Sequence, residues 1–476
     1  MASRPGATDT GNPPYASAVR AITRQKVSTY TERPDLSALG DIEITSAAPA
    51  YATALQKAIE ASGGSARCVT TPSGAGICLF TEGLTGGAPA SRHANLLQAI
   101  LSARDGVHCC VLDFSRSETL SDIGGFAGLC RSVRIERPGM RAHAFSSEKE
   151  PDLSTYASRV TQALPLPDND YKLDINGIWR DVPGPELLPP SSTIRTGSQP
   201  VWLVTGGARG VTASCAIELA RRTAGSFLLL GRSAPIPWPD WLEPVTDLKT
   251  LRGLLARNSS RPEIPRTPKE IDQLARRLMA GSEIASTLAA IEAAGATARY
   301  VQADIGNSTH LQSVLDQLQQ ETGTITGLVH GAGVLSDGRS ETLSEKAFET
   351  VFAPKVLGLA SLLDSLDVQQ LSHIGLFSSA SAVFGNEGQA NYAAANEWLN
   401  NVAEQLSADF PDTQVKSFCW GPWQGGMVDD ALARMFTERG IGLISRQEGA
   451  RIFADQLLSS PHDWVRFVVG DEWGPQ

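Results

Sequence analysis

Three side chains in the C-terminal half have the chemistry that carbonyl reduction needs: the hydroxyl of Ser379, the phenol of Tyr392 and the ammonium of Lys355. A phenol has a pKa of about 10, so it donates a proton poorly at neutral pH unless a nearby cation lowers that pKa. We expect Lys355 to be that cation, and Ser379 to hydrogen-bond the substrate oxygen as negative charge develops on it. The alternative interpretation is structural: a strand end, a packed helical tyrosine and a solvated lysine.

A glycine-rich loop lies upstream, between an apolar strand pattern that begins at Val201 and a helical pattern over 213–222. Glycine lets the backbone approach a pyrophosphate closely, and a helix N-terminus offers it unpaired N–H groups and a partial positive charge. The loop therefore predicts a dinucleotide site. Its candidate residues are Thr205, Gly206, Gly207, Arg209, Gly210 and Val211.

The next apolar strand pattern, 227–231, ends in Arg232 and Ser233, where the adenosine ribose would lie. NAD sites usually place an acidic residue here, whereas a basic residue favours the 2′-phosphate of NADPH. We therefore predict NADPH as the cofactor.

Two later strand ends complete the predicted cofactor site. Asp304 and Ile305 fit a wall beside the adenine, although Asp304 could instead cap the helix that begins near Asn307. The second strand end has glycines that permit a close backbone approach. Its candidate residues are His330, Gly331, Ala332 and Gly333.

Composition limits the class of protein. The 476 residues are 42% hydrophobic, which predicts two domains, and the net charge of −10 argues against nucleic acid or an anionic membrane as the main partner. The seven cysteines show neither a metal-binding spacing nor a disulfide framework, so we predict no metal site and a reducing, cytoplasmic location. No apolar stretch approaches a membrane span, and the N-terminus lacks the apolar core of a secretory signal.

The pattern of elements predicts two Rossmann-like, doubly wound parallel-sheet subdomains. Residues 1–35 are expected to be a linker or a loosely packed segment, 36–195 a structural subdomain without the cofactor loop, and 196–476 the catalytic, NADPH-binding subdomain. The first subdomain should end in a hairpin that turns at Asn176-Gly177. A helical insertion is predicted at about 234–290, either covering the sheet edge or docking a partner.

The order of the C-terminal motifs resembles the ketoreductase domains of modular polyketide synthases and related fatty-acid synthases, which belong to the extended short-chain dehydrogenase/reductase family. The resemblance covers nearly the whole chain, since such domains carry a truncated reductase ahead of the catalytic half. The loop and the long insertion are most similar to ketoreductases of polyunsaturated-fatty-acid synthases. The motifs are Thr205-Gly-Gly, Gly231-Arg-Ser, His330-Gly-Ala-Gly-Val, Pro354-Lys355, Phe377-Ser-Ser, Gly388 to Asn396, and Trp420-Gly-Pro-Trp423.

The resemblance implies a reaction and a set of roles. Tyr392 would donate the proton, and Lys355 and Asn396 would hold the relay in positions exchanged relative to other short-chain reductases. The substrate would be a β-ketoacyl thioester on the phosphopantetheine arm of an acyl carrier protein, within a synthase of several domains, and the product the 3R alcohol. Thr212 and Ser336 depart from the family pattern.

Further residues are implied to contact the substrate or to set its stereochemistry. An aspartate at position 337 goes with the 3R product, whereas the opposite class carries a tryptophan where this chain has Phe384. A hinge is plausible at Gly425-Gly426, although these glycines could equally end a strand. The substrate-side candidates are Leu335, Asp337, Phe384, Gln389, Trp423 and Met427.

Two other functions remain open. A free-standing reductase of a small ketone explains the catalytic half but leaves the N-terminal half without a role. A non-catalytic ketoreductase scaffold typically lacks the tyrosine or the glycine loop, and both are present here.

Overall fold

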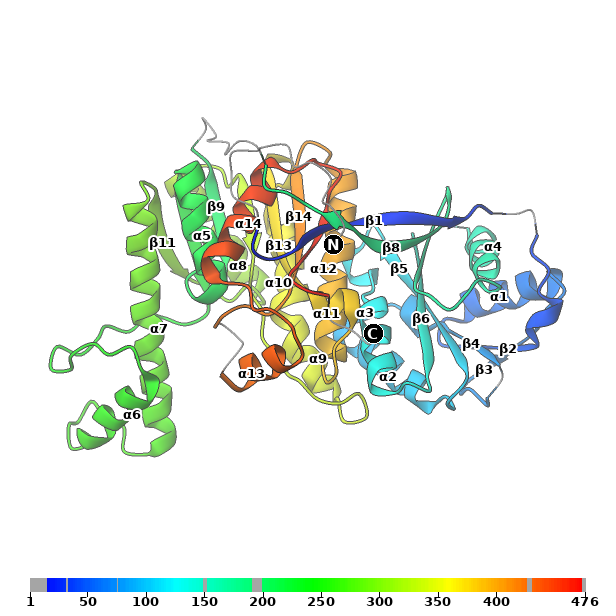
Figure 1. The fold of residues 1–476 in the computed structure, drawn as a ribbon, viewed down its shortest axis with the longest axis horizontal. Coiled ribbons are helices and arrows are strands. Elements are labelled where there is room, and N and C mark those ends of the chain that lie inside the picture. Colours follow the sequence, from blue (N-terminus) through cyan, green and yellow to red (C-terminus); the bar gives the residue numbers. More distant parts are fainter. Residues whose placement is uncertain are drawn as a thin grey trace, which may run out of the picture.

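The structure is a computed structural model that describes residues 15–30, 33–74, 76–148, 152–190, 199–425 and 430–472. Its described part has two α/β halves side by side, the N-terminal one built from residues up to 190 and the C-terminal one from residue 199 onward (Figure 1).

The C-terminal half contains seven parallel strands. They are β9 (Val201–Thr205), β10 (Ser226–Gly231), β11 (Thr297–Gln302), β12 (Gly327–His330), β13 (His373–Ser379), β14 (Gln414–Trp420) and β15 (Arg466–Val469). Their order in space is β11-β10-β9-β12-β13-β14-β15, the doubly wound arrangement predicted from the sequence.

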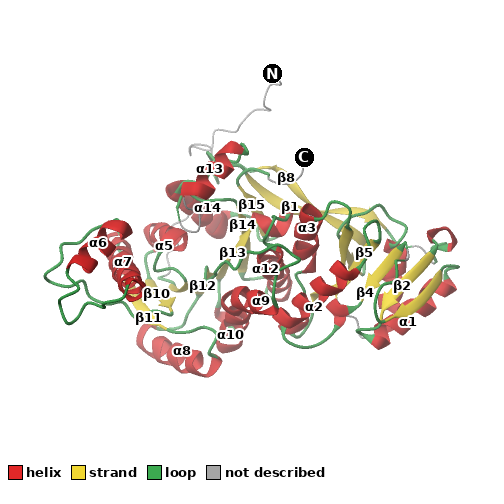
Figure 2. Ribbon diagram, turned by 90° about the horizontal axis from the view of Figure 1, so that it is seen from below, coloured by secondary structure: helices red, strands yellow, loops and turns green. Residues whose placement is uncertain are grey.

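Helices cover both faces of this sheet (Figure 2). They are α5 (Gly210–Thr223), α6 (Leu248–Arg257), α7 (Pro268–Ala293), α8 (Ser308–Thr322), α9 (Glu345–Phe352), α10 (Gly358–Ser365), α11 (Ala380–Phe384), α12 (Ala390–Asp409), α13 (Asp430–Glu438) and α14 (Arg446–Ser459). Successive side chains of β9 alternate between the faces: Trp202 and Val204 pack with α5, α7 and α14, and Leu203 packs with α8, α9, α10 and α12.

The N-terminal half repeats this alternation, as predicted. Its elements are β2 (Asp41–Thr45), α1 (Pro49–Ala61), β3 (Ser65–Val69), β4 (Ile77–Phe80), α2 (Pro89–Ser102), β5 (His108–Arg116), α3 (Phe126–Glu136), β6 (Arg141–Glu148), α4 (Leu153–Ala163), β7 (Tyr171–Asp174) and β8 (Gly177–Glu186). The predicted hairpin is β7–β8. Because Asp174 pairs with Gly177, its turn consists of Ile175 and Asn176, one residue earlier than the sequence indicated.

The prediction that residues 1–35 form a linker or a loose segment is wrong for Val19–Ser28, which form β1. This strand pairs antiparallel with β15 on one side and β8 on the other, and so joins all described strands into one 15-stranded sheet. Only Val19 and Ala21 are fully buried in this mostly polar strand, so its sequence carries a weak apolar pattern. The strand forms because β8 and β15 provide backbone hydrogen bonds on both of its sides. Residues 1–14 lie outside the described part.

The predicted insertion is helical, and its main element continues into the core. Thr267 caps α7 through the backbone N–H of Glu270, whose side chain accepts a bond from the Thr267 hydroxyl. The first half of α7 packs with α6 in a separate apolar cluster, and the second half packs on the sheet through Ile284 and Ile291. One helix therefore joins the protruding element at the left of Figure 1 to the face of the sheet that α5 and α14 cover.

Two sequence observations have a structural counterpart. Six of the seven cysteines are buried and Cys68 is exposed, all as free thiols. Among the helices of the described residues, none combines the length and the apolar composition that crossing a membrane requires.

Candidate active site

The candidate residues gather at the carboxyl ends of β9, β12 and β13. Thr205 pairs with His330, and His330 pairs with Leu376, so the ends of the three strands share one edge of the sheet. The glycine loop follows β9, the Gly331-containing segment follows β12, and Ser379 ends β13. This edge is where parallel α/β sheets bind ligands.

Lys355 reaches this edge from a π-helical segment, Ala353–Leu357. Such a one-turn widening commonly marks a functional position in a helix. The lysine side chain is buried; its Nζ donates to the carbonyl oxygen of Phe377 at 2.8 Å and lies 5.4 Å from the ring centroid of Tyr392. Burial lowers the pKa of Lys355 to about 7.

The expectation that Lys355 lowers the pKa of Tyr392 is wrong in this structure. Burial raises that pKa to about 12; the Asn396 amide opposes the shift and the charge of Asp337 adds to it. The reason is geometric, since the ammonium lies over the face of the ring and is bonded to the Phe377 carbonyl. Burial also lowers the pKa of Lys355 itself to about 7, which weakens its positive charge near neutral pH.

Asn396 and Ser379 retain hydrogen-bonding capacity. The Asn396 amide donates to the backbone oxygen of Tyr392 at 2.8 Å, while its buried Oδ1 has no partner among the described residues. Ser379 caps α11 and accepts from the backbone N–H and the hydroxyl of Ser381, so its own hydroxyl proton remains free to donate. A buried acceptor without a partner calls for an explanation, and a catalytic role or a bound water is one.

His330 connects the cofactor loop to Lys355. Its Nδ1 lies 2.9 Å from the Thr205 hydroxyl, and its Nε2 lies 3.1 Å from the backbone oxygen of Lys355. Burial, together with the Lys355 charge, lowers the pKa of His330 to about 3. The neutral ring therefore donates through Nε2 and accepts through Nδ1, because a carbonyl can only accept.

The loop and the end of β12 approach each other closely enough to exclude side chains. Gly206 has a φ of +68°, and a Cβ there would lie 3.0 Å from the backbone of Gly331. A Cβ on Gly331 would lie 2.5 Å from Thr212, and one on Gly333 would lie 2.9 Å from Lys355. Thr212 therefore fills the space that Gly331 leaves. Backbone without side chains, next to the N-terminus of α5, is the arrangement that lets the pyrophosphate of a dinucleotide approach closely.

The predicted ribose and adenine positions surround the ends of β10 and β11. Arg232 and Ser233 are exposed, and their backbone oxygens accept from Gln302 and Tyr300. Asp304 accepts from the N–H of Gly306 at 3.0 Å. The cap of α8 is Asn307 and not Asp304, so that alternative role for Asp304 is wrong. Ile305 is buried, and Val211 is partly buried in the first turn of α5.

The loop after β12 is tied to the segment that precedes Tyr392. Gln389 donates to Asp337 at 3.0 Å, and Asn391 donates to the backbone oxygen of Ser336 at 2.9 Å. Burial raises the pKa of Asp337, and the Gln389 bond opposes this shift. Leu335 lies in the same loop and is partly buried.

The remaining substrate-side candidates differ in position. Trp423 is 5% exposed and packs edge-on against Trp420, with ring centroids 4.8 Å apart, as a core residue. Phe384 lines a charged cavity of about 360 Å³ at the seam between the halves, together with Arg131 and Glu397. Met427 and the second glycine of the predicted hinge lie outside the described residues.

Sequence reasoning missed the contribution of α3, which lies against the helix that carries Tyr392. A Cβ on Gly125 would lie 2.0 Å from the backbone oxygen of Ala394, and one on Gly128 would lie 2.4 Å from that of Ala393. Two glycines three residues apart are a possible sequence signal for close helix packing. Nothing local, however, indicated which helix would be the partner.

Glu136, at the end of α3, was also missed. It is 8% exposed and accepts from the backbone N–H groups of Ser340 at 2.7 Å and Gly388 at 2.8 Å. One carboxylate of the N-terminal half therefore holds both loops that flank Tyr392.

Replacing Glu136 tests this positioning role. We expect Glu136→Ala to lower kcat/KM by about tenfold or more, because each lost bond to a charged group costs about 1.5–3 kcal/mol and both loops are released. Cofactor affinity should stay unchanged. Steady-state kinetics together with a cofactor titration measure both, with Glu148→Ala, at a partly exposed position on β6, as the control. Unaltered kcat/KM would mean that the loops hold their positions without Glu136.

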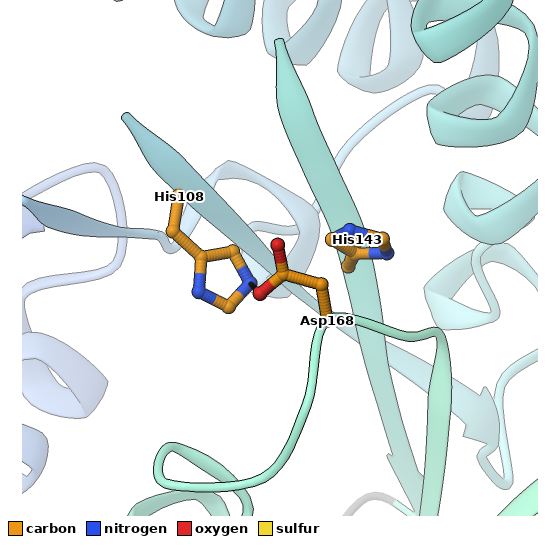
Figure 3. A group of neighbouring side chains, drawn as sticks. All are labelled: His108, His143 and Asp168. Carbon is orange, nitrogen blue, oxygen red and sulfur yellow. Dashed lines mark ion pairs between the residues drawn. The ribbon is translucent and has the colours of Figure 1, made fainter. Parts of the chain in front are cut away.

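A second cluster of titratable side chains lies in the N-terminal half (Figure 3). His108 Nε2 lies 3.4 Å from Asp168, whose two oxygens both bond to Arg141. Arg134 Nη1 lies 3.2 Å from His143 Nδ1. Since two guanidinium groups already engage this cluster, its surroundings disfavour a metal cation, and we assign none to it.

Comparison with known proteins identifies the catalytic half. Residues 200–425 match the family model described as the KR domain. The chain contains a ketoreductase domain. Such a domain is an oxidoreductase that acts on a keto group and uses a nicotinamide cofactor.

Similar proteins are synthases far longer than this chain. A polyunsaturated fatty acid synthase polypeptide of Thraustochytrium sp. is 31% identical over 355 residues, which are 72% of this chain and 13% of that protein. Polyketide synthase PksL of Bacillus subtilis is 24% identical over 336 residues, 68% of this chain and 6% of that protein.

Solved ketoreductases share the fold of the whole chain. An A-type ketoreductase from a modular polyketide synthase has a TM-score of 0.69 at 18% identity, covering 95% of this chain and 93% of its own. The ketoreductase from the first module of phoslactomycin biosynthesis in Streptomyces sp. HK803 has a TM-score of 0.66 at 20% identity, covering 96% and 93%. The predicted Rossmann-like α/β fold with a mainly parallel sheet is therefore confirmed.

Proposed function

We propose that this ketoreductase domain reduces a β-ketoacyl thioester, held on the phosphopantetheine arm of an acyl carrier protein, to a (3R)-β-hydroxyacyl thioester with NADPH. The observation that carries the proposal is the meeting of Lys355 and Tyr392, 5.4 Å apart from Nζ to ring centroid, at the strand edge where the glycine loop ends. The likeness to synthases of polyketides and polyunsaturated fatty acids supports this class of substrate.

The side chains divide the work of protonation. When bound, NADPH supplies the hydride that adds to C3. The hydroxyl of Ser379 donates a hydrogen bond to the carbonyl oxygen and stabilises the negative charge that develops on it. Tyr392 donates its proton to the same oxygen. Lys355, with a pKa of about 7, exchanges protons readily at neutral pH. The Oδ1 of Asn396 remains open to accept a hydrogen bond beside Tyr392.

The cofactor site gives NADPH its support. The glycines of the loop and of the β12 end would hold the pyrophosphate, and Arg232 with Ser233 would meet the 2′-phosphate. The hydrogen bond that Gln389 donates to Asp337 joins the two loops beside Tyr392. The direction from which the substrate enters beside these loops would decide which face of its carbonyl receives the hydride. The 3R assignment rests on the resemblance, in which an aspartate at position 337 goes with that product.

An assay with a thioester surrogate tests this function. We expect NADPH oxidation with the N-acetylcysteamine thioester of 3-oxobutanoate, much slower turnover of simple cyclic ketones, and mainly the 3R alcohol by chiral chromatography. Equal turnover of cyclic ketones would favour the free-standing reductase. Tight NADPH binding without turnover of any ketone would favour the scaffold, and a 3S product would contradict the role of Asp337.

A further inference from the structure

We propose that the inserted helix α7 completes the binding site for the 2′-phosphate of the cofactor's adenosine, with Arg277 and Arg276 as its specificity-determining residues. This inference rests on the proposed function, because it assumes an NADPH site at the end of β10. It assigns a role to an element that the sequence left open between covering a sheet edge and docking a partner.

The first observation is a hollow of about 160 Å³ between α7 and the ends of β9 and β10. Ser233, from the predicted ribose position, and Arg209, from the glycine loop, line one side of it. Arg276 and Arg277 line the other side from α7. Three arginines and one serine therefore line one small space, and no acidic residue is among the described residues that line it.

The balance of charge favours an anion in this space. Arg276 pairs with Asp272 at 2.9 Å, and Arg209 lies 3.9 Å from Glu283. Arg277 has no carboxylate partner among the described residues. A phosphate monoester carries about −1.5 to −2 charge at neutral pH and accepts several charge-assisted hydrogen bonds, so it matches this set of donors.

The backbone of α7 is shaped to bring these arginines to the cofactor loop. Gly281 lies in the middle of α7, where glycine is less favourable than alanine. A Cβ at Gly281 would lie 2.8 Å from the backbone oxygen of Ile236, so the glycine lets the segment after Ser233 pack directly on α7. Arg276 and Arg277 lie one turn before this contact.

Two polar contacts fix α7 on the glycine loop itself. Thr287 donates to the backbone oxygen of Ala208 at 3.0 Å, and Glu283 accepts from the backbone N–H of Gly210 at 3.0 Å. The helix therefore bonds both a backbone carbonyl and a backbone N–H of the loop. Arg276 and Arg277 therefore have a fixed backbone position beside Ser233 and Arg209. Selective binding of one phosphate group depends on donors that are held in place before the ligand arrives.

Binding of adenosine nucleotides tests the proposal without turnover. Calorimetry with adenosine 2′,5′-bisphosphate and with adenosine 5′-monophosphate isolates the contribution of the 2′-phosphate, and nicotinamide fluorescence gives Kd values for NADPH and NADH. We expect Arg277→Ala to weaken the bisphosphate and NADPH by about ten- to a hundredfold, and to leave the monophosphate and NADH within about twofold. Arg276→Ala should have a smaller effect in the same direction, because Arg276 shares its charge with Asp272.

Two control variants sharpen the result. Arg277→Lys should retain part of the preference, since it keeps the charge and loses the planar fork. Arg257→Ala, an exposed arginine at the far end of α6, should change none of the four affinities. The inference is overturned if Arg277→Ala leaves bisphosphate affinity intact, or weakens bisphosphate and monophosphate alike. If the unaltered protein binds neither NADPH nor NADH, the proposed function fails first and this inference falls with it.

Discussion

Replacing Tyr392 by phenylalanine should lower kcat by about 10²–10⁴-fold, the usual contribution of a positioned proton donor. The ring and its packing remain, so Lys355 keeps the aromatic face that its Nζ approaches at 5.4 Å. NADPH affinity should therefore change little. Single-turnover reduction of the thioester surrogate, with a parallel fluorescence titration of NADPH, measures both quantities.

Tyr171→Phe is the matched control for this change. Its hydroxyl donates to the backbone oxygen of Pro167 in the N-terminal half, away from the strand edge that holds Tyr392. We expect that variant to retain its kcat. A Tyr392→Phe variant with tens of per cent of the original activity would mean that another group protonates the substrate oxygen.

Glu404 of α12 should contribute strongly to the stability of the seam between the halves. Its carboxylate bonds to Lys172 of β7 at 2.6 Å, Arg24 of β1 at 2.7 Å and Arg466 of β15 at 2.9 Å. Glu404→Gln removes one of two carboxylates that these cations share, since Asp181 also pairs with Lys172 and Arg466, and breaking a buried pair typically costs about 3–5 kcal/mol. Urea unfolding at pH 7 measures the loss in the free energy of unfolding.

The pH dependence of this loss has a defined sign. Burial opposes ionisation of Glu404, but the charges of Lys172, Arg24 and Arg466 outweigh it and hold the pKa of Glu404 well below its usual value. The stabilisation is therefore complete above the unfolded-state pKa of about 4.3, and it is lost as the pH falls toward the folded-state pKa. The unfolding free energies of the two proteins should differ by a constant amount above about pH 5 and converge below it.

Glu349→Gln is the control for this experiment. Glu349 forms an exposed ion pair with Lys346 at 3.0 Å within one helix, and such pairs contribute little. Its unfolding curve should overlay that of the unaltered protein at every pH. A Glu404→Gln protein as stable as the parent would mean that the three cations find other partners at the seam.

Much of the fold could be predicted from the sequence because its signals are local. The apolar runs of β9, β10 and β13 are each followed by glycine, serine or helical patterns, and parallel strands separated by helices leave few possible topologies. The candidate residues at the strand ends follow from the same rule, since the carboxyl ends of parallel strands meet at one edge. The order of the motifs along the chain was enough to indicate a ketoreductase.

Contacts between distant segments were decided only by the tertiary structure. β1 has a polar sequence, and it becomes a strand because β8 and β15 supply partners on both sides. The bonds from Glu136 to Ser340 and Gly388 join segments more than 200 residues apart, which no local pattern encodes.

The electrostatics of the candidate site depended on tertiary packing in the same way. The sequence order of Lys355 and Tyr392 indicated that they would meet, but the pKa of a phenol depends on burial and on where the neighbouring charge lies. In the folded chain, burial raises the pKa of Tyr392 to about 12 and lowers that of Lys355 to about 7. Sequence alone could therefore name the reacting groups, and only the packed interior could determine their protonation, because desolvation and charge geometry are properties of the assembled fold.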